Sequence, residues 1–114
     1  MSVPGAQAAA AGTAGLRLTA AGSGRLALEG ALTFATARAA RDLGMRTLAA
    51  GAGGALEIDC AGVTAADSAG LAVLLDWLRI AKSAGRPLRY TNLPAGLLAL
   101  ARISEVEGLL THGV

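Results

Sequence analysis

The amino-acid sequence predicts an α/β fold, because short apolar runs of strand length alternate with longer segments of helical periodicity. The predicted order is ββαβαβα, in a mostly parallel or mixed sheet of about four to five strands with about three to four helices. Two alternating runs on either side of a turn sequence indicate an N-terminal hairpin. With 114 residues, 54% of them hydrophobic and 16% charged, the chain has the size and composition of one globular domain.

The N-terminal stretch MSVPGAQAAAAGTA is interpreted as a disordered, Ala/Gly-rich leader over residues 1–14, followed by a single domain over residues 15–114. No Lys or Arg precedes Arg17, so the charged start of a signal peptide is missing. No apolar run reaches the length of roughly 20 residues that a membrane span needs. We therefore expect a cytoplasmic protein that does not insert directly into a membrane.

The first elements follow from alternation and then from helical spacing. Residues 16–29 alternate around the turn sequence AAGSG, which predicts a β-hairpin. Thr33 is the expected N-cap of a helix over residues 34–50. Phe34 and Met45 lie on the helical spacing of that segment and are assigned to its apolar stripe.

The second half of the chain is expected to alternate strand and helix in the same way. Its expected elements are a strand over residues 55–60, a loop over 61–67, a helix over 68–84, a strand over 88–91 and a helix over 94–103. Residues 104–110 add a turn and a short closing element. This alternation implies crossover connections between parallel strands.

The stretch VTAADSAGLAVLL, residues 63–75, joins a small-residue loop to a leucine-rich helix through one acid and one hydroxyl. In open α/β sheets the binding surface usually lies at the carboxyl ends of the strands, and this joint lies at such an end. Asp67 or Ser68 can cap the helix by accepting a hydrogen bond from an unpaired backbone N–H of its first turn. One interpretation is therefore a helix cap with no further role.

The other interpretation is a partner contact centred on Ser68. At 100° per residue, Ser68 and Ala72 lie on a mostly polar arc of the helix, away from its leucine stripe. The surrounding loop and first turn would shape this contact through Thr64, Asp67, Ala69 and Gly70. A phosphate on Ser68 would suit the positive end of the helix dipole, so modification is compatible with folding.

The same helix carries a second apolar stripe, which includes Trp77. Either neighbouring helices cover this stripe, or Trp77 stays partly exposed and docks a partner, as Trp often does at interfaces. Ala72 and Trp77 are therefore the candidate interface residues on the body of the helix.

Several functional classes lack the residues that they need. The Lys and Arg residues are scattered and the net charge is +2, which disfavours nucleic-acid binding. The single histidine, His112, is near the C-terminus, and Ser68 has no evident general base. One cysteine, Cys60, allows no internal disulfide and no cysteine-rich metal site. We expect a non-enzymatic interaction module with no cofactor and no metal.

Residues 56–110, LEIDCAGVTAADSAGLAVLLDWLRIAKSAGRPLRYTNLPAGLLALARISEVEGLL, resemble the STAS domain family. This family includes anti-sigma factor antagonists and the cytoplasmic region of sulfate transporters. The resemblance covers residues 16–110, and its specific part is the D-S-x-G-L motif at residues 67–71. The fold that the family implies has the same order of elements as the one predicted above.

Two branches of the family imply different partners. The segments LAVLLDWLRIAKSAGRPL and LPAGLLALARISEVEGLL are similar to MlaB-type domains. That branch implies a cytoplasmic accessory subunit that binds the ATPase of a phospholipid-transport ABC system. The system maintains outer-membrane lipid asymmetry. The subunit would be held at the inner membrane peripherally, through its partner. The alternative is an anti-sigma factor antagonist, in which a partner kinase, itself the anti-sigma factor, phosphorylates the residue matching Ser68. Residues 1–14 depart from the compact pattern of both branches.

Overall fold

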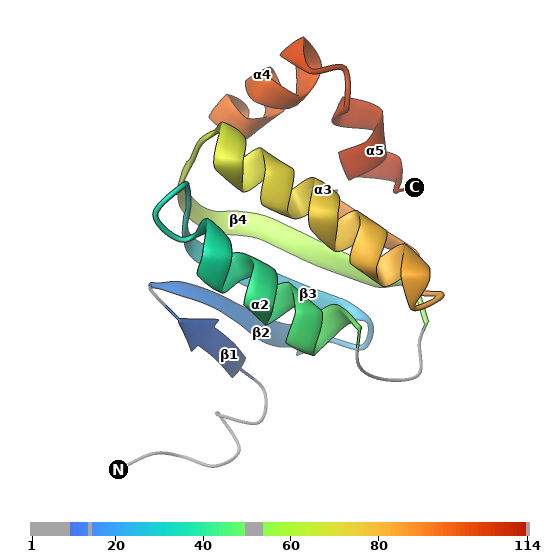
Figure 1. Ribbon diagram of the computed structural model, residues 1–114. Coiled ribbons are helices and arrows are strands. Elements are labelled where there is room, and N and C mark those ends of the chain that lie inside the picture. The colour runs from blue at the N-terminus through green and yellow to red at the C-terminus, as the bar shows by residue number, and fades with distance from the viewer. Residues whose placement is uncertain (1–9, 14, 50–53, 114) are drawn as a thin grey trace.

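The computed structural model describes residues 10–13, 15–49 and 54–113, and it contains one five-stranded mixed sheet covered by helices (Figure 1). The strands are β1 (Ala10–Thr13), β2 (Leu16–Gly22), β3 (Arg25–Leu32), β4 (Leu56–Ala66) and β5 (Leu88–Thr91). The helices are α2 (Ala37–Leu48), α3 (Ser68–Ser83), α4 (Ala95–Ile103) and α5 (Glu107–His112). The predicted α/β class and alternation are confirmed, and α5 is the short closing element.

The strands lie in the sheet in the same order as in the sequence. β1, β2 and β3 are antiparallel neighbours, whereas β3, β4 and β5 are parallel. The predicted hairpin is therefore confirmed as β2 and β3, which turn at Gly22 to Gly24. Gly24 has a φ of 69°, a left-handed conformation that glycine adopts without steric cost. The parallel strands need the crossover helices α2 and α3.

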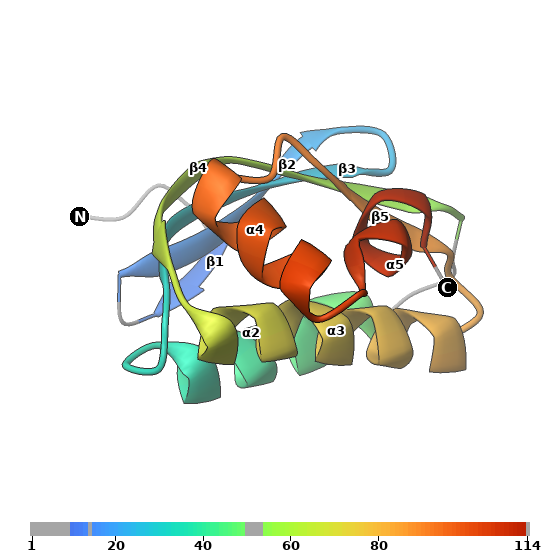
Figure 2. The same ribbon diagram turned by 90° about the horizontal axis from the view of Figure 1, so that it is seen from above.

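One face of the sheet is apolar and the other is charged. Figure 2 shows α2 and α3 side by side beneath one face, with α4 and α5 packed beside α3. Leu16, Leu28 and Ile58 point into the layer between this sheet face and the helices and are fully buried. On the opposite face Arg17 pairs with Glu29 at 2.9 Å, one of several ion pairs that link neighbouring strands there. This polar face needs no covering layer.

Trp77 is fully buried, so the alternative in which a neighbouring helix covers its stripe is confirmed, and the alternative in which Trp77 stays partly exposed to dock a partner is wrong. Its indole Nε1 donates a hydrogen bond to the carbonyl of Ala40 at 3.0 Å. The ring lies against Gly44, where a Cβ atom would come within 2.1 Å of the indole. The glycine therefore makes room for the ring, and α2 covers the second apolar stripe of α3.

Three predicted boundaries are wrong. Residues 10–13 form β1, so the disordered leader predicted for residues 1–14 fails there, whereas residues 1–9 and 14 lie outside the described part. β4 continues through residues predicted as a loop, because parallel pairing with β3 extends to the register of Leu32 with Ala66. The first long helix begins at Ala37 and not at residue 34, because residues 33–36 form a separate turn.

Candidate functional site

The residues singled out by the sequence lie where β3 and β4 end. Because the two strands are parallel, their carboxyl ends meet at one edge of the sheet. β3 leads into the turn of residues 33–36, and β4 leads through Asp67 directly into α3. We call the surface around Asp67 and Ser68, including this turn, the junction surface.

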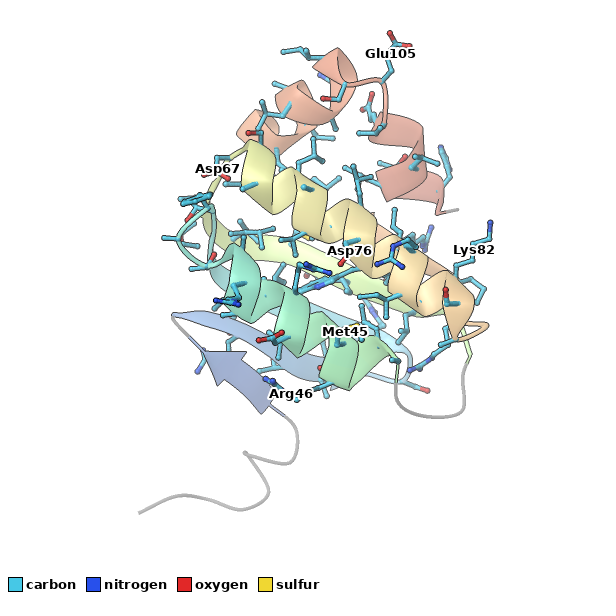
Figure 3. The ribbon with its side chains drawn as sticks, in the orientation of Figure 1. Met45, Arg46, Asp67, Asp76, Lys82 and Glu105 are labelled. Carbon is cyan, nitrogen blue, oxygen red and sulfur yellow. The ribbon has the colours of Figure 1, made fainter. Side chains whose placement is uncertain are left out.

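Asp67 holds the two strand-to-helix junctions together. Its Oδ1 accepts a hydrogen bond from the backbone N–H of Gly70 at 3.0 Å, which caps α3. Its Oδ2 accepts one from the backbone N–H of Phe34, also at 3.0 Å. Of the two candidate caps, Asp67 is therefore the residue that caps α3. Figure 3 shows Asp67 at the first turn of α3, next to the turn before α2.

The hydrogen bonds from Phe34 and then Gly70 hold the pKa of Asp67 below its ordinary value of 3.8. An acid with a lowered pKa in the folded state stabilises that state above the unfolded pKa. This contribution is lost as the pH falls through the lower, folded-state pKa. The carboxylate therefore stays charged, and its two oxygens stay bonded, throughout the neutral range.

We expect Asp67→Asn to make folding less sensitive to acid. Wild-type stability should fall more steeply than that of the variant as the pH is lowered from about 5 to below 3.8, because only the wild type protonates this group. Urea unfolding of both proteins at a series of pH values measures the difference. All other acidic residues are the same in the two proteins. Parallel plots of unfolding free energy against pH would therefore show that protonation of Asp67 does not affect stability.

Gly70 brings the first turn of α3 into close contact with the end of β3. A Cβ atom at this position would lie 2.0 Å from the carbonyl oxygen of Leu32, so only glycine fits without movement. Gly70 is accordingly buried. Gly70 is predicted to shape the site, and it does so by letting the backbone of α3 approach that of β3 closely. This close approach fixes the position of Ser68 at the start of the helix.

Ser68 is exposed as the first residue of α3. Within the described residues its hydroxyl makes no hydrogen bond, and it is Asp67 that accepts the cap bond from the Gly70 N–H. Thr64 and Ala72 are also exposed, whereas Ala69 is half-buried. The structure thus places Ser68 and Ala72 on the surface of α3, one helical turn apart, and moves Trp77 into the core.

Phe34 is a surface residue that the sequence interpretation missed. The predicted helix assigned it to an apolar stripe, but 83% of its surface is exposed on the turn before α2. Thr36 orders this turn: its Oγ1 accepts from the Thr33 N–H at 3.0 Å and donates to the Ala31 carbonyl at 2.9 Å. The presence of Arg38 and Arg41 on the same helical spacing was the signal that this stripe faces outward.

Farther from the strand ends, an ion-pair network joins α2 to α3. Asp76 projects from α3 toward α2, as Figure 3 shows, and its carboxylate contacts Arg41 Nε at 3.1 Å and the Arg79 guanidinium. Partial burial opposes the charge of Asp76, but the two guanidinium groups outweigh it and lower its pKa. The outer surfaces of α2 and α3 therefore form one connected face.

The part of the chain that the structure describes has no group of three or more His, Cys, Asp or Glu side chains able to hold a metal ion. None of its helices is both long enough and apolar enough to cross a membrane. Cys60 is fully buried in β4, and desolvation raises the pKa of its thiol to about 12, so the reactive thiolate does not form at neutral pH.

Comparison with protein families gives one finding. A family model described as "Mlab, STAS domain" matches residues 15–111, which include all strands from β2 onward and every described helix except the last residue of α5, His112. The comparison with individual curated proteins found no match.

Proposed function

The chain belongs to the family of MlaB-type STAS domains, and from that membership we propose that it is a non-catalytic accessory subunit. Its partner in this proposal is the ATPase of a phospholipid-transport ABC system that maintains outer-membrane lipid asymmetry. The domain would bind the ATPase on the cytoplasmic side of the inner membrane and support its activity. The junction surface, with Ser68 at its centre, is the proposed contact.

The observation that carries this proposal is the exposed hydroxyl of Ser68, which has no hydrogen-bond partner among the described residues and lies on a rigid helix start. Asp67 caps α3 with one oxygen and binds the neighbouring turn with the other, so Ser68 has no structural task in its own helix. Gly70 lets the first turn of α3 pack directly against the end of β3. A surface held this firmly loses little conformational entropy when a partner covers it, which favours binding.

A non-catalytic role is supported by the arrangement of the reactive side chains. Nucleophilic catalysis at Ser68 would need a base within hydrogen-bonding distance. Both oxygens of the adjacent Asp67 already accept backbone hydrogen bonds, which hold the pKa of this carboxyl group below its ordinary value and make it a weaker base. His112 lies at the end of α5, which packs against β5 and not against the junction surface.

We expect Ser68→Glu to weaken binding to the ATPase by at least about 100-fold, because it places an unpaired charge in a contact from which water is excluded. Ser68→Ala is the matched control for folding. Since Asp67 is the cap, this control should change the free energy of unfolding by less than about 0.5 kcal/mol. The measurement is co-purification of each chain with the co-expressed ATPase, followed by titration calorimetry. Equal affinity of wild type and Ser68→Glu would remove Ser68 from the interface.

An anti-sigma factor antagonist is the second candidate, favoured by the accessibility of Ser68. A kinase can reach this exposed hydroxyl without unfolding α3. The added phosphate would benefit from the helix N-terminus but would lie next to the Asp67 carboxylate, so it would change the charge that a partner meets. Phosphorylation of Ser68 by an anti-sigma kinase, combined with failure to bind the ATPase, would favour this candidate.

A further inference from the structure

Resting on the proposed function, we infer that the ATPase contact extends from Ser68 across the outer side of α2. We call this side the α2 face, formed by Phe34, Arg38, Arg41, Met45 and Arg46. The occupant that fits it is an acidic surface of the ATPase with an apolar pocket for the Phe34 ring. The inference depends on the exposure, rigidity and charge of these five residues.

Phe34 has the properties of an interface anchor. It is the most exposed large apolar side chain among the described residues, with 83% of its surface accessible. Its backbone is nevertheless fixed, because its N–H binds Asp67 and the surrounding turn is closed by Thr36. An aromatic ring on a rigid support can enter a pocket with little loss of conformational entropy.

The α2 face is continuous with the junction surface. Asp67 binds both the turn that carries Phe34 and the helix that begins at Ser68. A shallow groove then runs along α2 and is lined by Phe34, Ala37, Arg38, Arg41, Asp42 and Met45. Met45, which is 52% exposed, lies on the C-terminal half of α2 in Figure 3. A partner that covers Ser68 therefore reaches the α2 face without a gap.

The charge of this region is positive. The outward charged residues of α2 and α3 are five basic side chains and two acidic ones, a net charge of +3: Arg38, Arg41, Asp42, Arg46, Asp76, Arg79 and Lys82. Among the described residues, Arg38, Arg46 and Lys82 make no ion pair, whereas Arg41 and Arg79 share Asp76. Unpaired cations beside an apolar anchor are complementary to an acidic partner surface.

Two other occupants fit less well. A second copy of the chain would bring two faces of equal positive charge together, which is repulsive. A lipid surface would favour a continuous apolar strip, but arginines separate Phe34 from Met45 along α2.

The experiment compares the affinity of the full-length chain and its variants for the purified ATPase subunit, by titration calorimetry at about 50 mM and about 300 mM salt. Phe34→Ala should weaken binding at least about 20-fold. Arg38→Glu should weaken it at least about tenfold at low salt and less at high salt. The matched controls are Ile103→Ala, which removes an equally exposed apolar side chain from α4, and Arg17→Glu on the charged sheet face. Both controls should stay within about twofold of wild type.

Each contrary outcome has a separate meaning. If Ser68→Glu abolishes binding while Phe34→Ala and Arg38→Glu leave it unchanged, the proposed function stands and the inference is overturned. If the wild type does not bind the ATPase, the proposed function fails and the inference fails with it. Two further results would overturn the inference: sedimentation of the wild type with phosphatidylglycerol vesicles, or its self-association in light scattering. Either counts against the inference if Arg38→Glu abolishes it without changing the affinity for the ATPase. Because Phe34 and Arg38 are exposed, unchanged melting curves are expected for both variants.

Discussion

Gly70→Ala is expected to lower the free energy of unfolding by about 3 kcal/mol, near the upper end for overpacked sites. The new methyl group would have to occupy space 2.0 Å from the Leu32 carbonyl oxygen, which belongs to the sheet backbone. The first turn of α3 must therefore move away from β3. That movement would strain both hydrogen bonds to Asp67 and displace Ser68, so partner binding should fall together with stability.

Chemical denaturation followed by circular dichroism measures this effect, and Gly96→Ala provides the matched control. Gly96 lies in the first turn of α4, where a Cβ atom would meet nothing within 4 Å. The same chemical change there should be neutral or stabilise the fold by up to about 1 kcal/mol, because alanine favours helix. Equal effects at the two positions would mean that α3 does not press against β3 as described.

Trp77→Ala is expected to cost about 4 kcal/mol, which is a large fraction of the stability of an ordinary domain. The substitution removes the largest buried side chain from between α2 and α3 and opens a cavity beside Gly44. It also removes the hydrogen bond from Nε1 to the Ala40 carbonyl. Loss of this ring should loosen α2 from α3, so the face that both helices form should lose order as well.

Trp77→Phe is a milder change at the same position. It keeps one aromatic ring in the core but loses the N–H donor and the five-membered part of the indole, so we expect a cost of about 1 to 2 kcal/mol, smaller than that of Trp77→Ala. Urea unfolding monitored by circular dichroism suits both variants, because neither retains a tryptophan signal. A cost below about 1 kcal/mol for Trp77→Ala would contradict the buried position of the ring.

The fold was largely predictable because its local signals agree with its tertiary structure. Alternating residues in β2 and β3 and helical spacing in α3 gave the correct elements. The errors occur where tertiary contacts override local preference. Thr33 is a good cap by type, yet Asp67 accepts a hydrogen bond from the N–H of Phe34, 33 residues before it, and holds residues 33–36 in a separate turn. The length of β4 likewise depends on its pairing with β3.

The candidate site was predictable in position but not in detail. The motif at residues 67–71 correctly indicated a helix start at a strand end. Which of its two polar residues caps the helix depends on side-chain geometry that spacing does not encode. The burial of Trp77 depends on Gly44, a residue on another helix. The exposure of Phe34 depends on the same long-range hydrogen bond that holds residues 33–36 outside the helix, which therefore starts later than predicted.

Amide hydrogen exchange of the full-length chain, with and without the purified ATPase, tests whether a protein partner covers the junction surface. We predict that the ATPase slows exchange in residues 33–42 and 67–73, on both sides of Asp67. Residues 103–110, which carry the exposed Ile103 and Leu109 on α4 and α5, should exchange at the same rate in both samples. Protection confined to residues 103–110, with residues 67–73 unchanged, would show that the partner does not cover the junction surface.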